Sequence, residues 1–214
     1  MSFETMQGGN SVRNENCVFM LYFVRHAQSM GNADSENTDP SIVLDYDKAN
    51  PSLSPLGFKQ AEAVGKRFIG ENLTAMYISP YLRTKQTAQA ILKYVDCETF
   101  FDKRLTEICS AQTETGFCEF DESRQAIRTR ADAFLSDIRR KYTNGEKVLV
   151  VSHAGFIGNM IFEILHIREP YIHMCVYNAS VSKINFFKDG TVKIAMLNDT
   201  AHIWDVEEDR MQWM

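Results

Sequence analysis

The chain has 214 residues, of which 44% are hydrophobic and 24% are charged, the ordinary balance of a soluble globular protein. This length suits one large α/β domain or two small ones, and it can bury a sizeable core without disulfides or metals. The formal net charge of -5 argues against a general binder of nucleic acid or of anionic membranes, although a local basic cluster can still hold a small anion.

The beginning of the chain and the cysteines carry no targeting or disulfide signal. Residues 1–16 are polar without a long apolar run, so we expect a mobile N-terminal tail rather than a signal peptide. No later run reaches the ~18–20 apolar residues of a membrane span. The five cysteines are odd in number and contain no CxxC pair. This pattern favours reduced thiols and a cytoplasmic location.

After the tail, strand-like runs alternate with helical patterns. A buried strand is predicted over residues 18–24, which are all apolar or aromatic. The polar residues 32–50 predict a long surface loop or a short lid. A helix then begins where Ser54 can cap it and Pro55 fits its first position, and it runs to Gly70.

The same alternation continues to the end of the chain. Irregular structure is expected from Glu107 to Ser123. Asp189-Gly190 lies between two strand-like runs and predicts a hairpin. The remaining strands are predicted over residues 75–78, near 100–105, and over 147–152, 182–187 and 191–197, and the remaining helices over 81–94, 122–142 and 153–165.

Strands that alternate with helices predict an α/β fold. We expect a three-layer sandwich with a mostly parallel central sheet and helices on both faces. The final hairpin must add one antiparallel strand. No repeat or long linker divides the chain, so residues 17–214 are expected to form a single domain.

Charged and polar residues follow four of the predicted strands, at the point where each strand ends. Ligands of open α/β sheets bind just outside the carboxyl ends of the strands. We therefore expect these side chains to meet at one edge of the sheet. They are Arg25 and His26 after the first strand, Arg83 after the second, Glu107 after the third and His153 after the fourth.

Such a group suits phosphate chemistry. Two guanidiniums can hold a dianionic phosphate through forked hydrogen bonds. A neutral histidine can attack phosphorus, nearby cations keep it neutral, and a second histidine, if protonated, adds positive charge. A carboxylic acid can protonate the leaving oxygen and then activate water. A metal site made of His26, His153 and Glu107 is an alternative, but the two arginines would repel a divalent cation.

These residues lie in motifs that resemble the histidine phosphatase superfamily, also called the phosphoglycerate mutase-like family. The family's first signature is similar to RHAQSMGN at residues 25–32. The further motifs follow in the family's order and cover nearly the whole chain after the tail, which argues against chance agreement. They are LSPLG with QA over residues 53–61, SPYLRTKQTA over 79–88, LTE over 105–107 and VSHAG over 151–155.

The resemblance implies a catalytic domain with roles for individual residues. His26 is implied to be the nucleophile that becomes phosphorylated, and Glu107 the proton donor. The implied phosphate-binding residues are Arg25, Asn32, Arg83 and His153. No metal and no organic cofactor is implied, and the expected partner is a phosphorylated small-molecule substrate.

The chain departs from the family pattern at two places. Ala27 replaces the usual glycine, and residues 109–116 read CSAQTETG where the family often has a glycine and a Trp-Glu-Gly run. Glu114 therefore stays a second candidate for the acid, and Cys109 is expected to be an inert thiol. The segment after Glu107 also lacks the longer basic insertion with which phosphoglycerate mutases grip a second phosphate, and this favours a phosphatase.

Two alternatives to the phosphatase stay open: a phosphoglycerate mutase-type phosphotransferase and a non-catalytic module that binds a phosphorylated ligand. Residues 33–51 and 108–121 are expected to line the leaving-group side, where acids outnumber bases, which argues against a second strongly anionic group on the substrate. Residues 198–202 resemble a C-terminal element of the family, for which structural hydrogen bonding is expected. Nothing in the sequence specifies an oligomeric state.

Overall fold

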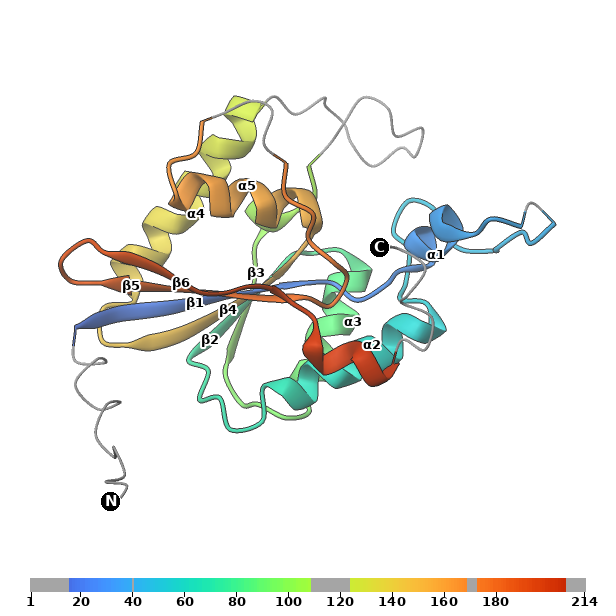
Figure 1. The fold of residues 1–214 in the computed structure, drawn as a ribbon, viewed down its shortest axis with the longest axis horizontal. Helices are drawn as coiled ribbons and strands as arrows, with labels where there is room; N and C mark the ends of the chain where they lie inside the picture. The colour runs from blue at the N-terminus through green and yellow to red at the C-terminus, as the bar shows by residue number, and fades with distance from the viewer. Residues whose placement is uncertain (1–15, 40, 109–123, 169–172, 207–214) are drawn as a thin grey trace, which may run out of the picture.

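The computed structural model describes residues 16–39, 41–108, 124–168 and 173–206. They form a six-stranded sheet with helices on both faces (Figure 1). One face is covered by α4 (Arg124–Lys141) and α5 (Ala154–Ile164), and the other by α2 (Pro55–Arg67) and α3 (Leu82–Ile91). The predicted three-layer α/β sandwich is confirmed.

The sheet has the strand order β3-β2-β4-β1-β5-β6. The first four strands in the chain pair in parallel, whereas β5 runs antiparallel to both β1 and β6. β5 is therefore the single reversed strand that the hairpin was predicted to add. The bounds are β1 (Cys17–Arg25), β2 (Ala75–Ile78), β3 (Glu98–Phe101), β4 (Glu146–Ser152), β5 (Val181–Phe187) and β6 (Val192–Asp199).

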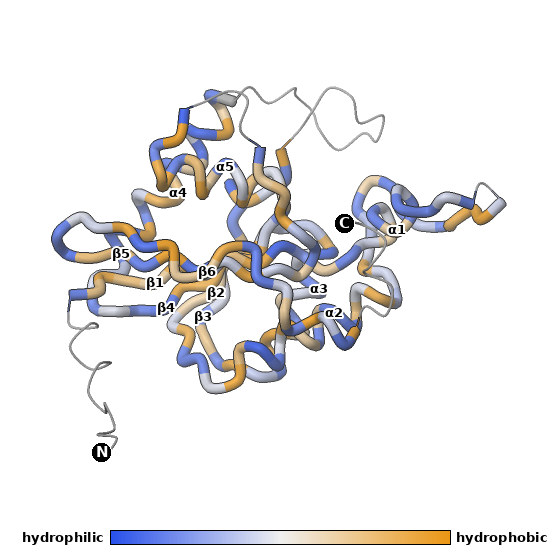
Figure 2. Tube along the Cα trace, viewed as in Figure 1, coloured by the Kyte–Doolittle hydropathy of each residue, from blue (hydrophilic) through white to orange (hydrophobic). Residues whose placement is uncertain are grey.

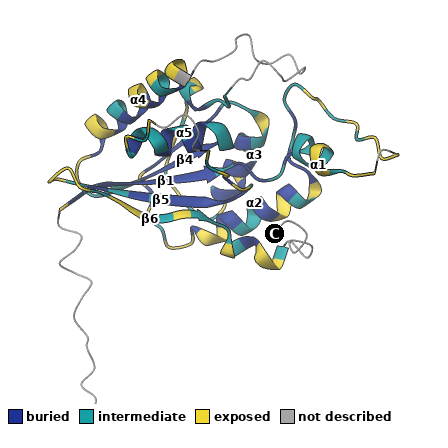
Figure 3. Ribbon diagram, turned by 45° about the horizontal axis from the view of Figure 1, so that its top comes forward, coloured by how far each residue is buried: buried dark blue, intermediate teal, exposed yellow. Residues whose placement is uncertain are grey.

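The hydrophobic core lies on both sides of the central strands. Along β1, Phe19, Leu21 and Phe23 pack toward α4 and α5, while Met20 and Val24 pack toward α2 and α3. This alternation explains why the strand is continuously apolar, since both of its faces are buried. Figure 3 shows β1, β4 and β5 largely buried between the helices, and Figure 2 shows that the turn between β5 and β6 is hydrophilic.

The segment 32–50, for which a long surface loop or a short lid was predicted, begins within a helix that was not predicted, α1 (Met30–Glu36). Ser29 caps this helix and Asn32 completes a capping box, in which each side chain accepts a hydrogen bond from the other residue's backbone N–H. The helix contains Asn, Asp, Ser and Gly, which have low helix propensity. Local capping, which the composition did not reveal, offsets that weakness.

Other boundaries differ from the predictions by a few residues. α3 ends at Ile91 rather than near residue 94. The predicted Ser54 cap of α2 is confirmed, because the Ser54 side chain accepts from the Gly57 N–H.

Of the predicted tail only Asn16 is described, and its carbonyl accepts from the Lys188 N–H at 3.0 Å. The segment 109–123, with Cys109 and Glu114, lies outside the described residues.

Two further findings concern the described residues alone. The described cysteines, Cys17, Cys97 and Cys175, are free thiols. No helix within these ranges is both long and apolar enough to cross a membrane.

Buried polar side chains of α2 and α3 hold the turn that follows β1. Thr87 Oγ1 accepts from the Ala27 N–H at 3.1 Å, and Gln60 Oε1 accepts from the Gln28 N–H at 2.8 Å. The hydroxyl of Ser54 donates to Gln28 Oε1 at 2.6 Å. An unpaired backbone N–H in the interior would cost ~1–3 kcal/mol. These side chains therefore allow the chain to leave the sheet in an irregular but defined conformation.

The start of α2 packs directly on the same turn. A Cβ atom at Gly57 would lie only 1.9 Å from the carbonyl oxygen of Gln28. Glycine at this position is therefore required by the close approach of the two backbones.

We predict that Gly57→Ala lowers the free energy of unfolding by roughly 3 kcal/mol, because backbone must move to admit the methyl group. The matched control is Gly158→Ala in α5, where a Cβ atom would make an ordinary contact at 3.6 Å with Met174. The control should be neutral or slightly stabilising. Urea unfolding of both variants tests this, and equal stabilities would contradict it.

Candidate active site

The predicted site residues meet at the carboxyl edge of the parallel strands. Arg25 ends β1 and His26 follows it, while Arg83 lies in the first turn of α3, after β2. His153 joins β4 to α5, and Glu107 lies two residues beyond η1 (Lys103–Leu105), after β3. The ring centroids of the two histidines are 5.2 Å apart, and Arg83 donates to His26. The structure thus brings together the five residues that follow the strand ends.

His26 is buried and held in one tautomer. Arg83 Nε lies 3.2 Å from His26 Nε2. Because a guanidinium can only donate, His26 Nε2 must be the acceptor of this hydrogen bond. The proton therefore lies on Nδ1, which donates to the Ala27 carbonyl at 2.8 Å. Burial, together with Arg83 and Arg25, holds the pKa of His26 well below its ordinary value. The imidazole is therefore neutral, with its lone pair on Nε2.

His153 is fully buried beside His26. Its Nε2 atom is 2.8 Å from the hydroxyl of Ser79, and its ring packs edge-on against Tyr81. Burial lowers the pKa of His153 well below its ordinary value, and His26 and the arginines of the site lower it further. These surroundings therefore disfavour the protonated second histidine that was considered from the sequence.

The two guanidiniums are largely buried. Arg25 Nη1 donates to the Val176 carbonyl at 2.7 Å, and the Arg83 guanidinium lies over the ring of Tyr81 at 4.6 Å. Burial lowers the pKa of both arginines, and the nearby Glu107 carboxylate partly offsets this. Arginine nevertheless keeps its charge in proteins. The site therefore holds two positive charges close to one carboxylate.

Two buried nitrogen atoms of the site have no hydrogen-bond partner within the described part of the chain. They are Nε of Arg25 and Nδ1 of His153. A buried polar atom without a partner costs ~1–3 kcal/mol, so each such atom in a folded protein needs an explanation. Both belong to predicted phosphate-binding residues, and a bound oxyanion would supply the missing partner.

Backbone N–H groups fix the Glu107 carboxylate at the start of α5. Oε1 accepts from Ile108 at 2.8 Å and from Phe156 at 3.2 Å, and Oε2 accepts from Gly155 at 3.4 Å. A Cβ atom at Gly155 would lie 2.7 Å from Oε1 and 2.5 Å from Ile108. The glycine of the second-histidine motif is therefore needed for the carboxylate to reach the helix.

Asn32 contributes to the site mainly through structural hydrogen bonds. Its Oδ1 atom accepts from the backbone and the hydroxyl of Ser29, at 3.1 and 3.0 Å, and from Asn178 Nδ2 at 3.2 Å. It thus connects α1 to the loop before β5. Its predicted contact with phosphate stays a prediction.

The sequence reasoning missed the loop at residues 175–180, which encloses the histidine from the side of β5. Asn178 Nδ2 and the Ala179 N–H donate to the His26 carbonyl at 3.0 and 3.2 Å, and the Arg25 N–H donates to Ser180. The only available signal was the position of this segment just before a predicted strand. The SPYLRTKQTA motif also contains Ser79, for which the sequence predicts no role although its hydroxyl contacts His153.

The C-terminal element at residues 198–202 holds this loop through the expected structural hydrogen bonds. Asn198 accepts from the Tyr177 N–H and donates to the Cys175 carbonyl, both at 2.9 Å. The His202 Nε2 atom is 2.9 Å from the Ala179 carbonyl oxygen. The element therefore acts on the site indirectly, through the loop that holds Arg25 and His26.

A neutral buried histidine, two guanidiniums and a fixed carboxylate at one edge of an α/β sheet are groups that suit phosphoryl chemistry. Among the residues that the structure describes, no group of three or more His, Cys, Asp or Glu side chains is placed to hold a metal ion.

The chain belongs to the histidine phosphatase superfamily (branch 1), whose family model matches residues 21–118 and 109–200. It is 25% identical over 232 residues to a "probable phosphatase" of Schizosaccharomyces pombe, covering 98% of this chain and 79% of that protein. It is also 25% identical over 224 residues to a "probable phosphoglycerate mutase GpmB" of Enterobacter sp. (strain 638), covering 91% and 100%. These names include both phosphatase and mutase.

Among solved structures, the fold is similar to phosphoserine phosphatase from Entamoeba histolytica, solved in complex with 3-phosphoglyceric acid. The TM-score is 0.62 at 19% identity, over 86% of this chain and 99% of that one. This likeness supports the fold.

We predict that the two buried histidines make the protein less stable as the pH falls below 6.5, their ordinary pKa. They stay neutral in the folded state but take up protons in the unfolded chain, so the free energy of unfolding falls with decreasing pH. Each contributes at most about 1.4 kcal/mol per pH unit. The effect is lost above pH 6.5, where both states hold neutral histidines.

Urea unfolding between pH 7.5 and 5.5 in phosphate-free buffer measures this slope. His153→Gln should reduce it, because one of the two groups is removed. His173→Ala is the control, since His173 is exposed. The same slope in His153→Gln as in the wild type would show that His153 is not held neutral.

Proposed function

We propose that this chain is a metal-independent phosphatase that hydrolyses a phosphomonoester through a phosphohistidine on His26, with Glu107 as the proton donor. The observation that carries this proposal is the state of His26. Its imidazole is neutral, its Nε2 lone pair faces Arg83, and Nδ1 is anchored to the Ala27 carbonyl. A nucleophile for phosphorus needs such a fixed, unprotonated nitrogen.

In the proposed complex, the phosphate takes the partners that the site leaves open. Its oxygens accept from the Arg25 guanidinium and from His153, and they take over the hydrogen bond that Arg83 now makes with His26 Nε2. This exchange frees the His26 lone pair for attack. The negative charge of the phosphate also favours protonation of His153, which would then carry a charge matching that of the transferring group.

The reaction then follows in two balanced steps. In the first, the phosphomonoester arrives with one proton, which passes through the Glu107 carboxylate to the leaving oxygen while a bond forms between His26 Nε2 and phosphorus and the ester P–O bond breaks. In the second, the Glu107 carboxylate takes a proton from water as the water oxygen attacks phosphorus, and the P–N bond breaks. The products are an alcohol and inorganic phosphate, which leaves with the proton from Glu107, so both side chains return to their starting states.

The acidic surroundings of Arg25 favour a phosphatase over a mutase. Glu36 is close enough to Arg25 to raise its pKa, and it accepts from Gln28 Nε2 at 2.7 Å. Asp34 on the same helix accepts from the Tyr46 hydroxyl at 2.9 Å. Carboxylates here would repel the second anionic group that a phosphoglycerate carries. A phosphorylated small molecule is the proposed substrate class, and a cytoplasmic location stays a prediction.

We expect wild-type protein, quenched shortly after mixing with a ³²P-labelled phosphomonoester, to carry acid-labile label, because phosphohistidine is the intermediate. His26→Ala should carry no label and should lose at least about 1,000-fold in kcat/KM. His173→Ala, a change at an exposed histidine, should keep both. Label that persists in His26→Ala would exclude His26 as the nucleophile.

We also expect hydrolysis to dominate over transfer. When 3-phosphoglycerate is supplied, release of free phosphate should exceed formation of 2-phosphoglycerate in a coupled assay. The reverse result would assign the chain to the mutases. A chain that binds phosphate but turns over neither this compound nor aryl phosphates would be a binding module.

A further inference from the structure

A guanidinium outside the phosphate pocket holds the segment that carries Glu107. Arg130, on α4, donates through Nη1 to the carbonyls of Arg104 and Thr106 at 2.6 and 2.8 Å. Its Nη2 atom donates to the Glu107 carbonyl at 3.5 Å. One planar fork thus reaches three carbonyls within four residues of chain, a geometry that lysine cannot reproduce.

The same guanidinium contacts the helix end that receives the Glu107 carboxylate. It lies over the ring of Phe156 at 4.7 Å, and the Phe156 N–H donates to Glu107 Oε1 at 3.2 Å. Arg130 therefore contacts both the backbone of Glu107 and the residue that holds its side chain. Its charge also helps to lower the pKa of His153.

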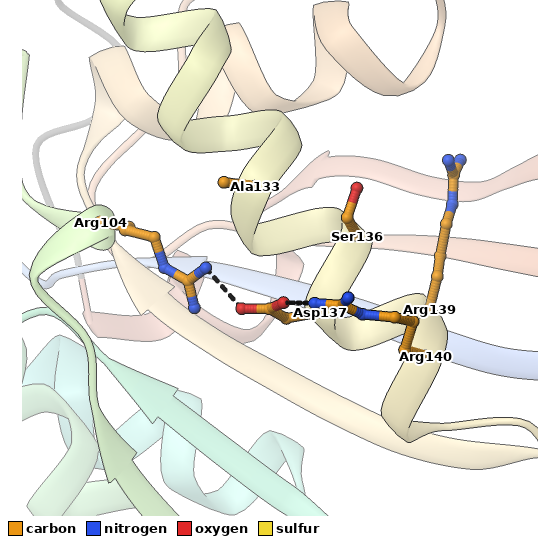
Figure 4. Close-up of a pocket in the computed structure, with 6 residues that line it drawn as sticks. All are labelled: Arg104, Ala133, Ser136, Asp137, Arg139 and Arg140. Atoms are coloured by element: carbon orange, nitrogen blue, oxygen red, sulfur yellow. Dashed lines mark hydrogen bonds and ion pairs between the residues drawn. The ribbon is translucent and has the colours of Figure 1, made fainter.

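A second contact ties the beginning of this segment to the same helix. The Arg104 guanidinium pairs with Asp102 at 2.7 Å. It also pairs with Asp137 of α4 at 2.6 Å, and Asp137 pairs with Arg140 (Figure 4). Arg104, Asp137 and Arg140 line an open groove of about 620 Å³ along α4. Arg104 therefore anchors the start of the segment, and Arg130 reaches its end at Glu107.

We infer that Arg130 is a positioning residue for the proton donor Glu107, an inference that rests on the proposed function. Residues 106–108 have no helix or strand of their own, so contacts with α4 and α5 set the place of the acid. Proton transfer requires hydrogen-bond distance to the leaving oxygen, and a shift of ~1 Å can cost roughly 100-fold in rate. Without the hydrogen bonds of the Arg130 guanidinium, the Glu107 carboxyl group would move out of hydrogen-bond distance of the leaving oxygen, while His26, Arg25 and Arg83 would stay in place.

Substrates with different leaving groups can distinguish a residue that positions the acid from one that only stabilises the fold. Phenolate is a strong base and needs a proton as the P–O bond breaks, whereas 2,4-dinitrophenolate is a weak base and needs little help. The value of kcat/KM reports the steps up to the phosphoenzyme, in which Glu107 acts as an acid. A misplaced acid should therefore lower kcat/KM for phenyl phosphate much more than for 2,4-dinitrophenyl phosphate, a substrate of similar shape.

The experiment measures kcat/KM for both aryl phosphates in wild type, Arg130→Met, Arg130→Lys, Glu107→Gln and Arg140→Met. Methionine keeps the stem of Arg130 over Phe156, and lysine keeps its charge but not the fork. Arg140→Met is the matched control, because it removes an exposed arginine of α4 that pairs with Asp137. If Arg130→Met does not fold, the comparison is made with Arg130→Lys.

We expect Arg130→Met and Arg130→Lys to lose about 10- to 100-fold with phenyl phosphate and less than about threefold with 2,4-dinitrophenyl phosphate. Glu107→Gln should show the same split more strongly, and Arg140→Met should show none. Equal losses of kcat/KM on both substrates, or no loss on either, in the Arg130 variants would overturn the inference. The proposed function would still stand in that case if Glu107→Gln loses more kcat/KM with phenyl phosphate than with 2,4-dinitrophenyl phosphate. If Glu107→Gln shows no split, the proposed acid is wrong and the inference falls with it.

Discussion

A neutral imidazole buried between two guanidiniums is the arrangement on which the rest of the site depends. Charging the buried His26 side chain would place a third positive charge beside the two guanidiniums, so burial and the arginines act in the same direction. The cost of burying the two arginines is met partly by the Glu107 carboxylate and partly by backbone carbonyls such as that of Val176. Two such guanidiniums suit the phosphate group of the proposed substrate.

The fold maintains this arrangement by fixing backbone rather than by packing side chains alone. The N–H of His26 donates to Ser152 on β4, and its carbonyl accepts from the loop before β5. Thr87 and Gln60 hold the two residues that follow. Parallel pairing of β1 with β4 places Arg25 opposite Ser152, next to His153. The proposed nucleophile is thereby connected to the central sheet and to helices α2 and α3.

The proposed acid is held differently from the proposed nucleophile. Glu107 is in an irregular segment, and its carboxylate depends on the first N–H groups of α5 and on the absence of a side chain at Gly155. Helix α4 holds its backbone through Arg130. Separate supports for acid and nucleophile mean that one can be disturbed without the other, and this is why the two functions can be examined independently.

Much of the fold could be predicted from residue patterns, because buried strands and capped helices are local features. The apolar run of β1, the Ser54-Pro55 start of α2 and the Asp189-Gly190 turn all led to elements that the structure contains. α1 could not be predicted in the same way, because a capping box around Ser29 supports a sequence of weak helix formers. Asn178 was missed because its partner His26 lies 152 residues earlier in the chain.

The sequence by itself determined the order of strands and helices along the chain and the residues that follow the strand ends. Periodicity and capping act over a few neighbouring residues, so they can be recognised without the tertiary structure. From these it was possible to expect Arg25, His26, Arg83, Glu107 and His153 at one edge. Only the tertiary structure decided the neutral state and tautomer of His26, the unpartnered nitrogens of Arg25 and His153, and the support of Glu107 by Arg130. These properties arise from burial and from contacts between distant segments, which no local pattern contains.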